Sequence, residues 1–293
     1  MARLGINLMA WAGGVGADEI ALFPRLAEIG YDGVELPLLA PDRIDSRRIR
    51  SALADTGLAC TASGALPHDA SLLIPDQRAQ GIAWIDQCLA GTAACGGTIL
   101  CGPFCAPIGE LSGRPPTTEE WDSCVLGLRE VGKRAADRGV FLALEVLNRF
   151  ETYFLNTAAD AVRLLAAIEQ PAVGIHLDTF HMNIEEKSIA RAIQQAGPHL
   201  AHVHFSENDR GTIGSGHVDW RSARDALDAV GYLQSDRWIT METFAGSIPE
   251  IAAATAIWRP IVPDAWTYAR DSLSFVRQIL TSRISKEKRS CVR

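Results

Sequence analysis

The sequence lacks a long uninterrupted apolar run, and it has no excess of positive charge. Its 293 residues contain no stretch of the roughly 20 consecutive apolar side chains that a membrane-spanning helix needs. With 28 Lys and Arg against 35 Asp and Glu, the net charge is −7. Binding to nucleic acid depends instead on clustered basic side chains that neutralise phosphates. These absences argue against a membrane protein and against nucleic acid as a partner.

A disulfide framework and a dinucleotide-binding loop are also missing. The seven cysteines are odd in number and follow no framework spacing, which favours free thiols in a reducing cytoplasm. The N-terminal segment up to Trp11 is typical of a first strand rather than of a signal peptide. Residues 13–16, Gly-Gly-Val-Gly, do not have the Gly-x-Gly-x-x-Gly spacing of a Rossmann fold.

What the sequence does contain is eight apolar runs separated by amphipathic segments. Such alternation is typical of parallel strands joined by helices, and eight units predict a single-domain (β/α)8 TIM barrel of the α/β class. An open doubly wound sheet is the alternative. We expect the barrel to span residues 1–283 and the basic residues 284–293 to form a flexible tail. The predicted strands are 4–9, 33–36, 58–65, 97–102, 140–146, 173–177, 200–205 and 238–241. The predicted helices are 18–29, 44–56, 75–94, 117–139, 157–169, 184–196, 220–230 and 264–281.

Four of the apolar runs end in a side chain that can bind a metal. Because the carboxyl ends of parallel strands meet at one end of a barrel, we expect these four side chains to converge there. Three carboxylates and one imidazole suit a hard or borderline divalent ion. Mn²⁺ is favoured, with Mg²⁺ or Co²⁺ as alternatives, over a structural Zn²⁺, which usually recruits cysteine. The four predicted ligands are Glu145, Asp178, His204 and Glu242.

Further polar residues lie in and after the same strands. His176 and His202 lie deeper in their strands than the predicted ligands, so we expect them in the core or orienting a ligand. Glu207 and Asp209 follow the seventh strand and are expected to be solvated or salt-bridged loop residues. Asp219 is a candidate cap for the helix that begins near residue 220.

Four motifs of this chain closely resemble those of the ketose 3-epimerases. That family includes the D-tagatose, D-allulose (psicose) and L-ribulose 3-epimerases and belongs to the xylose-isomerase-like barrels. The motifs are residues 144–157 (LEVLNRFETYFLNT), 177–183 (LDTFHMN), 202–210 (HVHFSENDR) and 214–220 (GSGHVDW). Val146 stands where many relatives have proline.

The resemblance implies roles for particular residues. A divalent metal, most often Mn²⁺, is expected on Glu145, Asp178, His204 and Glu242. The substrate's O1–O2 end is expected to be held by Glu151, His181 and Arg210. The distal sugar pocket is expected to be lined by Asn7, Trp11, Ser63 and the 102–108 loop. The resemblance also implies a homodimer or homotetramer.

The expected chemistry agrees with this resemblance. Inverting C3 of a 2-ketose means removing a proton α to the carbonyl and returning one to the other face, and a metal bridging O2 and O3 stabilises the enediolate. One base is needed on each face, and Glu145 and Glu242 are the predicted pair. No glycine-rich anion nest or Lys/Arg cluster is evident near the strand ends, which favours a free sugar over a sugar phosphate.

Two other reactions on the same barrel remain alternatives. Aldose–ketose isomerisation, as in hydroxypyruvate isomerase, and dehydration, as in inosose dehydratase, can both use an enediolate held by strand-end ligands. The segment 148–157 favours the epimerases. A nuclease resembling endonuclease IV would need additional histidines and a basic groove, and a non-catalytic sugar-binding protein would not need two glutamates flanking a metal.

Overall fold

The computed structural model describes residues 1–282, so the predicted tail 284–293 lies outside the described residues. Eight parallel strands close into one barrel in the order of the chain, with β8 pairing to β1 through registers such as Gly5↔Thr240. The predicted single-domain TIM barrel is confirmed, and the open-sheet alternative is wrong. The strands are β1 Arg3–Asn7, β2 Gly33–Pro37, β3 Ala59–Ser63, β4 Ile99–Gly102, β5 Phe141–Glu145, β6 Val173–Asp178, β7 Leu200–Phe205 and β8 Trp238–Met241.

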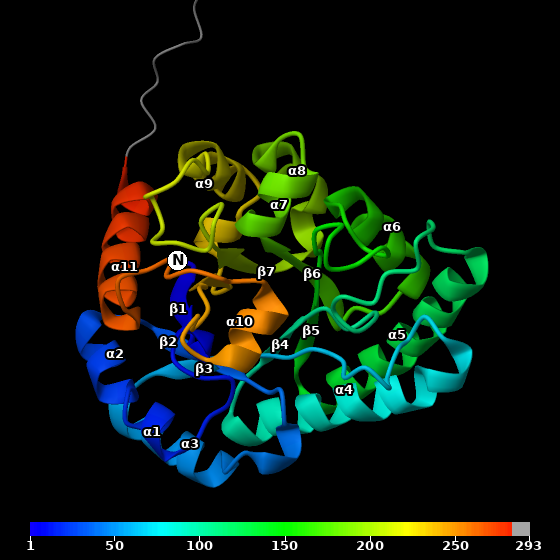
Figure 1. The fold of residues 1–293 in the computed structure, drawn as a ribbon, viewed down its shortest axis with the longest axis horizontal. Coiled ribbons are helices and arrows are strands. Elements are labelled where there is room, and N and C mark those ends of the chain that lie inside the picture. Colours follow the sequence, from blue (N-terminus) through cyan, green and yellow to red (C-terminus); the bar gives the residue numbers. More distant parts are fainter. Residues whose placement is uncertain (283–293) are drawn as a thin grey trace, which may run out of the picture.

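The helices form a ring around the strands, except for α10, which lies over them near the centre of the view (Figure 1). The predicted helix 18–29 is divided into α1 and α2, and the predicted helix 184–196 corresponds to α8 and the last two residues of a separate helix, α7. The separation of α7 from α8 follows from the caps, because Asp178 begins α7 and Ser188 begins α8. The sequence did not predict α10. The α-helices are α1 Ala17–Ile20, α2 Phe23–Ile29, α3 Ser46–Thr56, α4 Pro75–Cys95, α5 Thr118–Arg138, α6 Ala158–Ile168, α7 Thr179–Glu185, α8 Ile189–Ala196, α9 Trp220–Ala229, α10 Pro249–Thr255 and α11 Ala265–Thr281.

Local sequence signals fix several helix ends. Thr117 and Glu120 form a capping box at the start of α5, with each side chain accepting a hydrogen bond from the other residue's backbone N–H. Asp219 caps α9 by accepting from Ser222 N, as predicted. Gly57 ends α3 in the left-handed conformation, with φ +72°.

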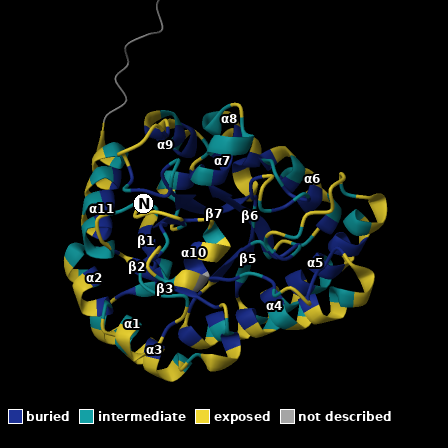
Figure 2. Ribbon diagram, viewed as in Figure 1, coloured by how far each residue is buried: buried dark blue, intermediate teal, exposed yellow. Residues whose placement is uncertain are grey.

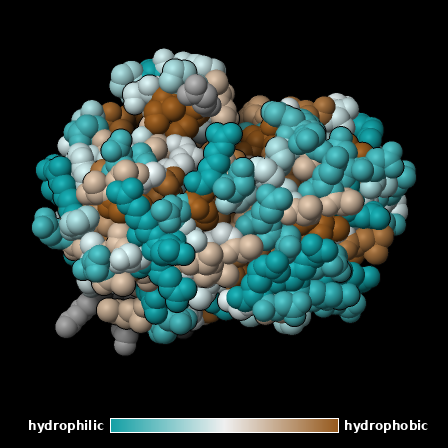
Figure 3. Space-filling view, turned by 90° about the horizontal axis from the view of Figure 1, so that it is seen from below, coloured by the Kyte–Doolittle hydropathy of each residue, from teal (hydrophilic) through white to brown (hydrophobic). Residues whose placement is uncertain are grey.

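The core extends from the barrel interior into the space between the strands and the helices. Every residue of β2, β6 and β7 is buried, as expected for parallel strands covered on both faces. Burial is concentrated in the strands and on the inner faces of the helices (Figure 2). The side formed by the helices at the lower edge of Figure 1 carries mainly hydrophilic side chains between small apolar patches (Figure 3). Among the described residues, no helix is both long and apolar enough to cross a membrane.

One close approach beside the barrel mouth requires glycine. Gly102 ends β4 with φ +142°, and a Cβ added there would lie 1.9 Å from the carbonyl oxygen of Gly64. We expect Gly102→Ala to lower the free energy of unfolding by roughly 3 kcal/mol or more, since it adds a backbone clash to an unfavourable φ. Gly96→Ala is the control, because Gly96 has φ +88° but no atom within 4 Å of an added Cβ. It should lose about 1 kcal/mol. Urea unfolding measures both, and equal losses would contradict the steric argument.

Candidate metal centre and active site

The carboxyl ends of the last four strands bring the predicted ligands to one end of the barrel. Glu145 and Asp178 are the final residues of β5 and β6, His204 lies near the end of β7, and Glu242 follows β8 directly. Ligand atoms of Asp178, His204 and Glu242 all lie within 4.8 Å of one another. Glu145 makes two such groups, one that includes Asp178 and one that includes His204. The side chains therefore form a cluster that could hold a metal ion.

The donors in this cluster fit a divalent cation. His204 Nδ1 is buried and makes no hydrogen bond within residues 1–282, and it lies 3.2 Å from Glu242 Oε1 and 4.0 Å from Asp178 Oδ2. A buried nitrogen that faces two carboxylates without a hydrogen bond fits a metal ligand. Carboxylate oxygens with one imidazole suit Mn²⁺, Mg²⁺ or Co²⁺ rather than a thiolate-rich zinc site.

The two predicted acid–base carboxylates have opposite electrostatic environments. Burial raises the pKa of Glu145, and the hydrogen bond and charge of His181 only partly offset this. Burial also disfavours ionised Glu242, but the charges of His204 and Arg210 outweigh it and lower its pKa to about 2. Environments that separate two carboxyl pKa values are typical of a proton donor paired with a proton acceptor. The surroundings therefore favour the protonated form of Glu145 and the ionised form of Glu242.

Arg210 is held tightly at the centre of the site. Its Nη1 donates to Asp178 Oδ2, to Glu242 Oε2 and to the Ser206 hydroxyl. The guanidinium carbon lies 4.2 Å from the ring centroid of Phe180 and 4.8 Å from that of Phe244. Arg210 also has φ +64°, an uncommon conformation for a residue other than glycine, of the kind found at functional sites. The carboxylates of Asp178 and Glu242 already compensate the charge of the Arg210 guanidinium.

Two of the predicted substrate-binding residues are positioned by Asn148. The Asn148 amide donates to Glu151 Oε1 at 2.7 Å, and its backbone N–H donates to His181 Nδ1 at 3.2 Å. His181 Nδ1 is therefore an acceptor, and Nε2 lies 3.5 Å from Glu145 Oε1 and 3.2 Å from Arg210 Nη2. Burial alone would lower the pKa of His181, but its hydrogen bond to Glu145 and the charge of Asp178 raise it.

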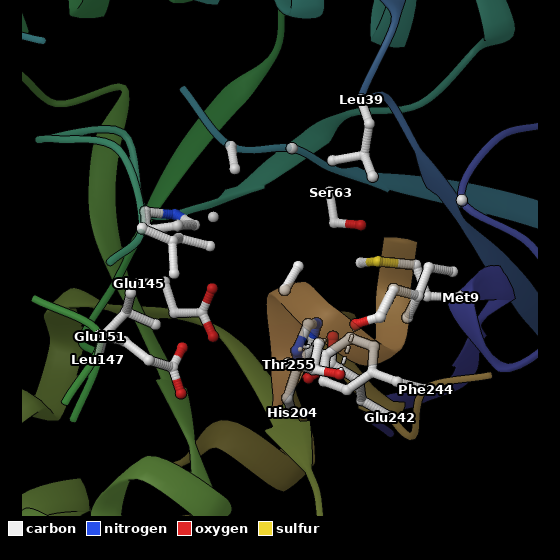
Figure 4. A pocket seen from close by; sticks show the side chains of 18 of the residues that line it. Met9, Leu39, Ser63, Glu145, Leu147, Glu151, His204, Glu242, Phe244 and Thr255 are labelled. Carbon is white, nitrogen blue, oxygen red and sulfur yellow. Dashed lines mark hydrogen bonds and ion pairs between the residues drawn. The ribbon is translucent and has the colours of Figure 1, made fainter. Parts of the chain in front are cut away.

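These residues surround a pocket of about 460 Å³, a size within the range of small-molecule sites. Glu145 and Glu151 lie on one side of the pocket, and His204 and Glu242 lie on the other (Figure 4). His181 and Arg210 also line it. The distal part is mainly apolar and is formed by Met9, Leu39, Ile108, Phe244, Ile248, Ile251, Ala254 and Thr255. Several of these belong to α10, which sequence reasoning missed.

The prediction for the distal lining is partly wrong. Ser63, Gly102 and Ile108 line the pocket as expected. Asn7 does not, because its side chain points into the barrel interior and donates to Glu35 and Glu242. Trp11 also lies away from this pocket, and its ring packs on Trp266 with centroids 5.1 Å apart.

The prediction that Glu207 is a solvated or salt-bridged loop residue is also wrong. The side chain is fully buried. Its carboxylate accepts hydrogen bonds from Trp220 Nε1 and from the backbone N–H groups of Gly214 and Val218. Glu207 therefore organises the loop between β7 and α9. Asp209 does lie in a surface ion pair, 3.6 Å from Arg259.

Sequence reasoning overlooked Glu35, a fully buried carboxylate on β2. The available signal was an acidic residue inside the apolar run Gly-Val-Glu-Leu-Pro, where a charge is unfavourable unless partners surround it. His176 and His202 are buried in the barrel interior, as predicted, and His202 Nε2 lies 2.8 Å from Glu35 Oε2.

A closed (β/α)8 barrel with a carboxylate and histidine cluster at the carboxyl ends of β5–β8 is typical of a metal-dependent barrel enzyme. Comparison with known proteins gives the same class. The family profile "Xylose isomerase-like TIM barrel" matches residues 23–278. The chain belongs to this family and, within it, to the ketose 3-epimerases. It is therefore an isomerase of the carbohydrate epimerase type.

Three relatives illustrate the similarity. The chain is 33% identical to a probable ketose 3-epimerase of Synechocystis sp., over 94% of this chain and 96% of the relative. It is also 33% identical to the L-ribulose 3-epimerase of Mesorhizobium japonicum, over 94% and 93% of the two chains. The crystal structure of D-allulose 3-epimerase from Methylomonas sp. with D-allulose superposes with a TM-score of 0.89, at 30% identity over 94% and 96%. The comparisons do not favour the isomerase or dehydratase alternatives.

Proposed function

We propose that this enzyme inverts C3 of free 2-ketoses such as D-tagatose, D-fructose/D-allulose or L-ribulose. The observation that carries the proposal is that Glu145 and Glu242 lie on opposite sides of one pocket (Figure 4). A ketose lying between them would present one face of C3 to each carboxylate, as inversion requires. The six described cysteines are buried free thiols, which supports a cytoplasmic location. Assembly as a homodimer or homotetramer is part of the proposal and rests on the family resemblance alone.

The chain's own residues supply binding and proton transfer. We propose Glu145, Asp178, His204 and Glu242 as ligands of a divalent metal, with Mn²⁺ favoured, and this metal would provide Lewis-acid stabilisation of negative charge on the substrate oxygens. The other proposed contacts with the O1–O2 end come from Glu151, His181 and Arg210. One glutamate takes the C3 proton to give the enediolate, and the other returns a proton from the opposite face. When the reaction starts from the other C3 epimer, the glutamate that acted as acid becomes the base, and the base becomes the acid.

Proton exchange into deuterated water tests this function directly. A panel of free ketoses is incubated in D₂O with Mn²⁺-loaded enzyme, the enzyme is removed, and proton spectra are recorded. We expect the C3 proton signal to disappear while the C3 epimer accumulates. Deuterium entering at C1 with formation of an aldose would instead identify an aldose–ketose isomerase. Loss of water from the sugar would identify a dehydratase.

Substrate choice should be strict at O1–O3 and loose at C4–C6, with phosphorylated ketoses poor substrates. Arg210 is the only Arg or Lys among the described residues that line the pocket, and Asp178 and Glu242 already compensate its charge. A phosphate would therefore be buried without a partner beside apolar side chains. We expect kcat/KM for D-fructose 6-phosphate to be lower than for D-fructose by about 10²-fold or more. L-Ribulose and its 5-phosphate are a second matched pair. A preference for the phosphorylated member of either pair would contradict this prediction.

A further inference from the structure

A charged side chain lies in the barrel interior on the core side of the proposed metal ligands. Glu35 is fully buried on β2, whose other residues are apolar or glycine. An isolated carboxylate in such a place would be strongly destabilising, so its neighbours must compensate its charge. Its neighbours include two imidazoles, because His204 Nε2 and His202 Nε2 lie 2.7 and 2.8 Å from its oxygens.

Side chains from four other strands surround this carboxylate, and its two oxygens are almost fully satisfied. Oε1 accepts from His204 Nε2 at 2.7 Å and from the Asn7 amide at 3.0 Å. Oε2 accepts from the Thr61 hydroxyl at 2.9 Å and from the Cys101 thiol at 3.3 Å, and His202 Nε2 lies 2.8 Å from it. So many partners fix the orientation of the carboxylate.

The two ring nitrogens of His204 face different partners. Nε2 faces Glu35, whereas Nδ1 faces Glu242 and Asp178 and makes no hydrogen bond within the described part of the chain. An imidazole that coordinates a metal is neutral, with one N–H and one lone pair. Since the carboxylate of Glu35 accepts the Nε2–H, the lone pair is on Nδ1, at the side where the other predicted ligands lie.

We propose that Glu35 is a positioning residue that holds His204 for the metal. By accepting the Nε2–H, it selects the tautomer and the ring orientation in which Nδ1 can coordinate. Asn7 extends the same arrangement to a second ligand, because its amide also donates to Glu242 Oε1 at 2.9 Å. This inference rests on the proposed function only for the presence of a divalent metal at His204.

An alternative interpretation is that the side chains around Glu35 bind a second metal ion themselves. Ligand atoms of Glu35, Cys101, His202 and His204 do lie within 4.8 Å of one another. However, His204 Nε2 and Glu35 Oε1 are hydrogen-bonded at 2.7 Å, and His202 Nε2 lies 2.8 Å from Glu35 Oε2, so neither pair leaves room for an ion between its atoms. The contacts therefore describe a hydrogen-bonded cluster.

Metal affinity measured without sugar tests the role of Glu35. In Glu35→Gln, the amide keeps the shape but replaces one acceptor oxygen by a donor. Free Mn²⁺, quantified by its electron paramagnetic resonance signal, should give a Kd that is higher by about 10- to 100-fold. Thr240→Val is the matched control, because Thr240 is opposite His204 on β8 and its buried hydroxyl has no hydrogen-bond partner among the described residues. Its Kd should stay within about twofold of wild type.

A second measurement uses the wild-type protein and does not depend on the variant folding. Nitrogen-15 NMR of the Mg²⁺-loaded protein should show His204 with a protonated Nε2 and an unprotonated Nδ1. The opposite tautomer, or an unchanged Mn²⁺ Kd in Glu35→Gln, would overturn the inference while leaving the proposed function intact. A wild-type protein that binds no divalent metal would overturn the metal assignment of the proposed function and this inference with it.

Discussion

Replacing either Glu145 or Glu242 by glutamine should slow C3 epimerisation in both directions by about 10²- to 10⁴-fold, the usual contribution of a general acid or base. Every turnover uses one glutamate as base and the other as acid, so either substitution slows the reaction in both directions. The reason lies in their placement, because the two carboxylates lie on opposite sides of the pocket (Figure 4). Rates are measured with each epimer as the starting ketose.

The two variants need not behave alike. In D₂O, the variant that retains the base for a given epimer is expected to exchange the C3 proton of that epimer without inverting it. Both glutamates are also proposed ligands, so bound metal is measured by elemental analysis on the same samples. If both variants keep their metal and epimerise at nearly the wild-type rate, the two-carboxylate mechanism is wrong.

Removing the metal should have an effect of similar size. Dialysis against EDTA is expected to lower turnover by about 10³-fold or more, because Lewis-acid stabilisation contributes several kcal/mol to such reactions. Mn²⁺ or Co²⁺ should restore activity better than Ca²⁺, which prefers six to eight oxygen ligands, whereas the four proposed ligands are three carboxylates and one imidazole. Full activity in a sample shown to be metal-free would refute the metal assignment.

Variants of single ligands separate metal loss from unfolding. Asp178→Asn keeps an oxygen for the hydrogen bond that caps α7, in which Asp178 Oδ1 accepts from Phe180 N. It removes the charge that faces the cluster. Asp178→Asn and His204→Ala, made as separate variants, should each lower metal occupancy. The circular dichroism spectrum of each EDTA-treated variant should stay close to that of wild type. Unchanged occupancy in both variants would exclude these residues as ligands.

Burial in irregular segments could not be predicted from the sequence. Glu207 looked like a loop residue exposed to solvent, yet it is fully buried and accepts from four N–H groups around it. A loop has no periodicity from which burial can be inferred. The same reason explains why α10 was missed, since its short apolar segment packs over the pocket rather than forming part of the repeated strand–helix pattern.

The sequence by itself determined the barrel and the position of the predicted ligands. Strands β7 and β8 were predicted to the residue, because an apolar run between helix signals is a local property. The direction of parallel strands then places Glu145, Asp178 and His204 at one end.

Only the tertiary structure decided which side chains meet inside the barrel. Glu35 and His204 are 169 residues apart and lie within hydrogen-bonding distance. Arg210 and Glu242 are 32 residues apart and form an ion pair. The first pair depends on how strands from the two halves of the chain are staggered when the sheet closes. The second depends on the path of the loop between β7 and α9. Neither the spacing nor the composition of a single strand contains that information.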